Sequence, residues 1–214
     1  MSARGGRASL IAVAAGLAIL AYITYNTLST TPGSSTGLAA GAHMPPFAAP
    51  LATSDLVGDA NVALHADEGA AGARPACSVT DPRALNSCTL ARRGPVMLAF
   101  FTQDAGRCLT TLDTLGALAA HDPRLGVAAV AIRGDRGTLR ALVRRHGWRF
   151  PVAQDRDGAV GDLYGVAICP TVVLAYRGGV VMRTALGSGQ TTAAALARDA
   201  RTLEAQRRGS GGTA

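Results

Sequence analysis

Two cysteines stand at positions that constrain the fold of this chain more than any other feature. The apolar stretch Val96–Phe101 leads through a short polar turn to Cys108, at the expected start of a helix. A helix N-terminus lowers the pKa of a thiol through its unpaired N–H groups and its dipole. Further along, Cys169 and Pro170 directly precede a second apolar, β-branched stretch. Pro170 is a candidate for a cis peptide bond, because only X-Pro bonds adopt that form at low cost.

The body of the chain alternates expected strands and helices. Val96–Phe101 and residues 127–132 are continuous apolar runs, typical of strands that are buried on both faces. Apolar residues recur at helical spacing in the three longest segments between and after the strands. These helices are expected over residues 106–120, 135–147 and 191–207, a short one over 157–164, and a hairpin joins strands over 171–176 and 180–184. The pattern predicts an α/β fold.

This arrangement resembles the thioredoxin superfamily, in which a strand leads through a Cys-x-x-Cys turn into a helix and a cis-proline loop packs against that turn. Cys108 matches the second cysteine of the motif, whereas Ala105 stands where the first, nucleophilic cysteine belongs. The resemblance implies a thioredoxin-like fold over residues 95–207, with a central mixed sheet flanked by helices. It also implies an N-terminal hairpin extension, with residues 61–64 as one of its strands, and a reaction that needs no cofactor.

The resemblance leaves three interpretations of the thiols. Cys108 and Cys169 form the working pair of a thiol-disulfide oxidoreductase, because the residue before the cis-proline lies beside the active-site turn in this family. Alternatively, Cys108 acts alone, as in the one-cysteine peroxiredoxins and thiol-specific antioxidant (alkyl hydroperoxide reductase) proteins, although Ala105 replaces their threonine. In the third, the domain is a redox-inactive binding module.

The resemblance also implies where a substrate would bind. Pro170 would be the backbone platform against which an extended substrate strand docks, with Gly106 and Arg107 in the neighbouring turn. Asp104 precedes the turn and is expected to cap the helix that follows. Trp148, the only tryptophan, is expected to be a packing anchor rather than a binding platform.

The N-terminus predicts a membrane anchor. Arg4 and Arg7 precede the uncharged, apolar residues 8–28, which as a helix of about 1.5 Å per residue would span the roughly 30 Å core of a bilayer. Basic residues before the run and none soon after it orient the N-terminus to the cytoplasm. A cleaved signal peptide, with its apolar region in residues 10–23, is the alternative.

The expected protein is therefore a single-pass cell-membrane protein whose C-terminal domain is extracytoplasmic. Its predicted parts are a cytoplasmic stub and anchor (1–28), a flexible linker (29–45), the thioredoxin-like domain (46–208) and a disordered Gly-rich tail (209–214). The expected partners are exported protein thiols or disulfides or a redox partner protein.

The net charge of +7 comes from arginine alone, since the chain has no lysine. The arginines are spread along the sequence and aromatic residues are few, so nothing indicates the clustered basic and aromatic face of a nucleic-acid-binding protein. The cysteines and histidines lack zinc-ligand spacing, and no metal site is expected.

Four cysteines suit an exported domain in an oxidising compartment. Cys77 and Cys88 lie close in sequence, separated by turn-forming residues, and are expected to form a structural disulfide. On the chain-entropy account, that bond is worth up to about 3 kcal/mol. The alternative is a redox-active pair on a mobile flap.

Overall fold

The computed structural model of the protein describes residues 13, 15–22, 24, 37–68 and 74–210. Contacts divide the chain into two units, residues 1–35 and 36–214. Among the described residues, no helix combines the length and apolarity that a membrane crossing requires. Much of the predicted anchor over residues 8–28 lies outside the described residues, as does the predicted tail from residue 211 on.

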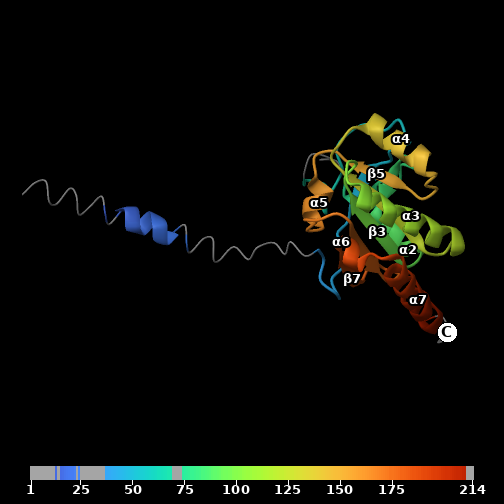
Figure 1. The fold of residues 1–214 in the computed structure, drawn as a ribbon. Coiled ribbons are helices and arrows are strands. Elements are labelled where there is room, and N and C mark those ends of the chain that lie inside the picture. Colours follow the sequence, from blue (N-terminus) through green and yellow to red (C-terminus); the bar gives the residue numbers. More distant parts are fainter. Residues whose placement is uncertain (1–12, 14, 23, 25–36, 69–73, 211–214) are drawn as a thin grey trace, which may run out of the picture. The chain divides into compact units, whose positions relative to one another are not determined.

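A five-stranded mixed sheet lies at the centre of the second unit (Figure 1). Its order is β5-β4-β3-β6-β7, with β4 parallel to both β3 and β5, and β6 antiparallel to both β3 and β7. The strands are β3 (Val96–Phe101), β4 (Gly126–Ile132), β5 (Val152–Asp155), β6 (Thr171–Ala175) and β7 (Val181–Leu186). The predicted mixed sheet is confirmed.

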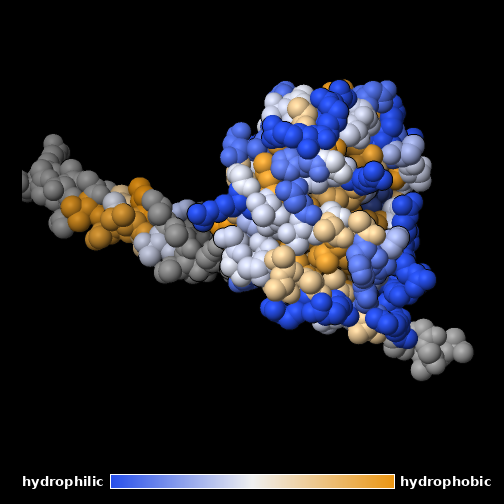
Figure 2. Space-filling view, turned by 45° about the vertical axis from the view of Figure 1, so that its right-hand side comes forward, coloured by the Kyte–Doolittle hydropathy of each residue, from blue (hydrophilic) through white to orange (hydrophobic). Residues whose placement is uncertain are grey.

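Alternate residues of β3 point to opposite sides of the sheet, so this strand contributes apolar side chains to both faces. Met97 and Phe101 belong to the apolar cluster on the face of α3, α4 and α7, while Leu98 and Phe100 belong to a second cluster with Tyr164. The helices are η1 (Ala76–Ser78), α2 (Ser87–Arg93), α3 (Gly106–His121), α4 (Arg136–His146), α5 (Ala159–Leu163), α6 (Gly187–Gln190) and α7 (Ala193–Ser210). Hydrophilic side chains spread over the outer face visible in Figure 2, with apolar ones between them.

The strand pairing of the N-terminal extension differs from the prediction. β1 (Ala48–Pro50) pairs antiparallel with β2 (Ala84–Asn86), not with residues 61–64. Asn61 forms only an isolated bridge to Ala48. The two strands are far apart in sequence and only three residues long, so no local turn or alternation marks the pairing.

The predicted linker over residues 29–45 is described only from residue 37. From there it runs beside β7. Val181 donates its N–H to Ala42 O and accepts one from Gly41, both at 2.8 Å. Thr184 Oγ1 donates to Leu38 O at 2.7 Å. The residues of the expected linker from 37 on therefore pack as part of the domain.

Trp148 is a packing anchor, as predicted. Its ring is 7% exposed and packs edge-on against Phe101, with centroids 5.9 Å apart, and stacks on Phe150. Its indole Nε1 donates to Asp113 Oδ1 at 2.8 Å. The indole therefore links β3, α3 and the segment before β5.

Candidate functional site

The turn between β3 and α3 is held by one glutamine. Gln103 Nε2 donates to Asp135 O at 2.6 Å, and Gln103 Oε1 accepts from Asp135 N at 3.0 Å. Gly134 lies beneath this contact with φ at +83°, and a Cβ there would lie 2.6 Å from the glutamine amide. The positive φ therefore favours glycine at position 134, where a Cβ would displace the glutamine amide that fixes the turn to the end of the neighbouring strand.

Cys108 is the third residue of α3 and is only 1% exposed. Its side chain belongs to the apolar cluster on that face of the sheet, together with Phe101 and Leu112. Its N–H donates to Ala105 O at 2.9 Å. The thiol that the sequence singled out therefore lies inside the core, at the N-terminal end of a helix of 16 residues.

The prediction that Asp104 caps α3 is wrong. The N-cap is Ala105, which has no side-chain oxygen, and no side-chain hydrogen bond caps this helix. The helix begins at Gly106, as the spacing predicted, and this places Ala105 rather than Asp104 at the N-cap. Asp104 is instead exposed and lines a polar depression with Gln103 and Arg133.

Cys169 and Pro170 are joined by a cis peptide bond and immediately precede β6. Pro170 is buried, and its carbonyl accepts the N–H of Gly187 at 2.8 Å. Thr171 Oγ1 donates to Ile168 O at 2.7 Å, which closes the loop. Because Thr171 pairs with Phe100 in the sheet, the loop lies beside the end of β3 that leads to Cys108.

The structure joins Cys108 and Cys169. Their sulfur atoms are 2.04 Å apart, their Cα atoms are 5.7 Å apart, and no cysteine of the described chain is free. The bond connects α3 with the cis-proline loop. Gly106 and Arg107, which the resemblance places in the turn beside a bound substrate, are exposed in the first turn of α3.

The sequence did not single out Asp155, a buried carboxylate. Asp155 ends β5 with no exposed surface, and its Oδ2 accepts the N–H of Gly161 at 2.8 Å. Burial raises the pKa of the Asp155 carboxyl, and the hydrogen bonds from the backbone of α5 oppose that rise. Within the described part of the chain, acidic, cysteine and histidine side chains form no group of three that could hold a metal.

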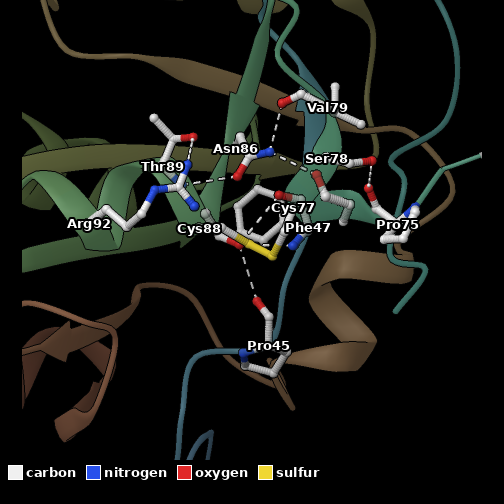
Figure 3. The surroundings of a disulfide bond; sticks show 12 residues. Pro45, Phe47, Pro75, Cys77, Ser78, Val79, Asn86, Cys88, Thr89 and Arg92 are labelled. Atoms are coloured by element: carbon white, nitrogen blue, oxygen red, sulfur yellow. Dashed lines mark hydrogen bonds between the residues drawn. A yellow bond between two sulfur atoms is a disulfide. The ribbon is translucent and has the colours of Figure 1, made fainter. Parts of the chain in front are cut away.

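Cys77 and Cys88 form a second disulfide, which connects η1 with α2 (Figure 3). Asn86 reinforces the same connection, because its Nδ2 donates to Ala76 O at 2.8 Å and to Val79 O at 2.9 Å. Its Oδ1 accepts the N–H of Thr89 at 3.1 Å and so caps α2. The sequence did not predict this helix, although the Asn cap and the two closing arginines are signals for one.

The Cys77→Ser/Cys88→Ser variant is expected to lower the free energy of unfolding by up to about 3 kcal/mol, because the bond closes a short loop in the unfolded chain. Urea titration of the oxidised proteins measures this. The rate of thiol-disulfide exchange should be the same in the variant as in the wild type. If the variant were as stable as the wild type but had lost exchange activity, the result would support the alternative that Cys77 and Cys88 are a redox-active pair.

No protein-family model and no curated protein matches this chain. Its similarity to known proteins is therefore to solved structures. A protein from Chlorobium tepidum assigned as the thiol:disulfide interchange protein DsbE superposes with a TM-score of 0.59 at 20% identity, over 78% of this chain and 98% of that one. The thioredoxin domain of a thiol-disulfide oxidoreductase from Bacteroides vulgatus gives 0.54 at 10% identity, over 75% and 97%. A protein from Bacteroides thetaiotaomicron assigned as a protein disulfide isomerase gives 0.57 at 14% identity, over 79% and 91%.

These likenesses show the fold. The chain has the thioredoxin-like fold, with its cis-proline at position 170, as the sequence predicted. The similarity covers more than the region from β3 to α7, since it extends over about three quarters of the chain.

Proposed function

We propose that this protein is a thiol-disulfide oxidoreductase that works through Cys108 and Cys169. The observation that carries the proposal is the bond between them, which joins the helix N-terminus after β3 to the residue before the cis-proline. The solved structures that share this fold include proteins described as thiol-disulfide oxidoreductases. The clients would be exported protein thiols or disulfides, or a redox partner protein.

The loop before β6 would hold an extended client. Pro170 forms the buried base of that loop, and Ile168 beside it is 48% exposed. An apolar client segment would gain by covering Ile168. Gly106 and Arg107 face solvent across the bond in the first turn of α3, where they would form the other rim of the docking surface.

The apolar residues 8–28, the basic residues before them and the two disulfides support an anchored, extracytoplasmic protein. Alkaline extraction of membranes from cells that express the full chain tests this. The full chain should remain in the membrane pellet, and a chain lacking residues 1–28 should not.

A disulfide-exchange assay tests the catalytic proposal. The oxidised wild type, Cys108→Ser and Cys169→Ser are compared in the reduction of insulin by dithiothreitol, with Cys77→Ser/Cys88→Ser as the matched control. Either single substitution should reduce the rate to that of the uncatalysed reaction, since no disulfide can then form between the two positions. Equal rates in all four proteins would refute the proposal.

The second candidate is a redox-inactive binding module. Ala105 in place of the family's first cysteine and the 1% exposure of Cys108 favour it, and equal rates in the insulin assay would support it. A one-cysteine peroxidase needs an accessible thiolate. The burial of Cys108 and its bond to Cys169 disfavour that alternative.

A further inference from the structure

We propose that Cys169, rather than Cys108, is the sulfur through which this protein exchanges disulfides with its clients. Cys108 then acts as the leaving and resolving thiolate. This assignment rests on the proposed thiol-disulfide exchange. It differs from the arrangement that the resemblance implies, in which the attacking thiol belongs to the turn before α3, at the position of Ala105.

Access to the two sulfurs is the first reason. Thiol-disulfide exchange begins when a thiolate reaches one sulfur of a disulfide, so the accessible sulfur is the one attacked. Cys108 is 1% exposed and is surrounded by the apolar cluster beneath α3. Cys169 lies at the edge of that cluster and is only partly buried. Its preceding neighbours Ala167 and Ile168 are exposed.

The quality of the leaving group is the second reason. A thiolate of low pKa leaves faster from a disulfide. Cys108 stands in the first turn of α3, where the helix dipole and the N–H groups of the turn stabilise negative charge and so oppose the cost of burying a thiolate in the apolar cluster. The N-cap Ala105 has no side chain that could accept a hydrogen bond from those N–H groups. Cys169 precedes a strand and has no such stabilisation.

The position of Cys169 in the docking loop is the third reason. A client strand that covers the exposed Ile168 would lie beside Cys169, the next residue of the loop. The client's sulfur would therefore approach the half-buried sulfur of the loop without entering the core. Reaching Cys108 from the same place would require α3 to separate from the loop.

The exchange then balances in two steps. A client thiolate attacks Cys169 Sγ, a client–Cys169 bond forms, the Cys108–Cys169 bond breaks, and its electron pair leaves on Cys108. A second client thiolate then attacks the client's own sulfur and releases Cys169 as a thiolate. The client dithiol is oxidised to a disulfide, the protein disulfide is reduced, and the two client protons pass to solvent or to the released thiolates. Reduction of a client is the reverse sequence.

Alkylation of the wild-type protein tests the assignment without any substitution. The Cys108–Cys169 bond is reduced with dithiothreitol, the reductant is removed, and limiting iodoacetamide is added. Peptide mass mapping then measures how fast each thiol is modified. Cys169 should react about 100-fold faster than Cys108, since burial blocks the second thiol. In guanidinium chloride the two rates should become similar. Faster modification of Cys108 in the folded protein would overturn the proposal.

Glutathione disulfide as a probe separates this assignment from the proposed function. Reduced Cys108→Ser, which keeps Cys169, should form a glutathione adduct rapidly, whereas Cys169→Ser should form one slowly. Circular dichroism of both variants serves as the control for folding. Rapid adduct formation only in Cys169→Ser would refute the assignment and leave the oxidoreductase intact. The expected order of rates together with an inactive wild type in the insulin assay would refute the oxidoreductase while Cys169 remained the accessible thiol.

Discussion

Tyr164→Ala is expected to lower the free energy of unfolding by about 4 kcal/mol, in the range measured for large aromatic residues truncated in a core. The side chain has no exposed surface. Its ring contacts Phe100, with centroids 4.9 Å apart, and meets Phe47 edge-on at 5.7 Å. Its hydroxyl donates to Pro45 O at 2.7 Å. The substitution removes the contact between the sheet, α5 and the segment before β1, and urea titration measures the loss.

Tyr164→Phe is the matched control. It keeps both ring contacts and removes only the hydrogen bond, so the expected loss is about 1 kcal/mol. Tyr176→Ala is a second control, because this tyrosine is only partly buried on the opposite face of the sheet. A loss for Tyr164→Ala no larger than for Tyr176→Ala would contradict the view that Tyr164 secures the N-terminal segment.

The same residue gives a pH dependence. Burial raises the pKa of the Tyr164 hydroxyl above its usual value. Above about pH 10 the unfolded chain therefore loses this proton while the folded chain keeps it, so that stability falls as the pH rises. Tyr164→Phe should be less sensitive to alkali than the wild type when unfolding is followed between pH 8 and about 11.

The central part of the fold could be predicted because its signals are local. Val96–Phe101 is a continuous apolar run and forms the central strand. The helix expected over residues 135–147 is α4, and Asp135 caps it by accepting the N–H of Thr138 at 2.7 Å. The order of strands and helices between β3 and α7 follows from such signals. The two cysteines that the structure joins could be singled out because each adjoins a recognisable strand.

The N-terminal extension could not be predicted in the same way. β1 and β2 have three residues each and pair across a long stretch of chain, so neither alternation nor a turn motif marks them. Residues 37–45 have the composition of a linker, yet their backbone hydrogen bonds to β7 hold them on the domain. Asp155 also shows no local signal, because its role depends on burial at the end of β5 against α5.

Reduction of the Cys108–Cys169 bond is expected to lower the free energy of unfolding by about 4 kcal/mol on the chain-entropy account, since the loop that it closes is far longer than that of the other disulfide. The two cysteines are 61 residues apart, against 11 for Cys77 and Cys88. The measurement uses Cys77→Ser/Cys88→Ser, in which this bond alone remains. Urea titrations of its oxidised and reduced forms give the difference directly.

The sign of that difference bears on the direction of electron flow. The fold stabilises the Cys108–Cys169 disulfide by as much as the disulfide stabilises the fold, because the two effects are linked through one thermodynamic cycle. An oxidised form more stable by about 4 kcal/mol therefore marks a bond that resists reduction, which suits a reductant of client disulfides. A reduced form of equal or greater stability would contradict the expectation. It would mark the protein as an oxidant, in which the stabilisation of the Cys108 thiolate by the N-terminus of α3 exceeds the stabilisation that loop closure gives the oxidised form.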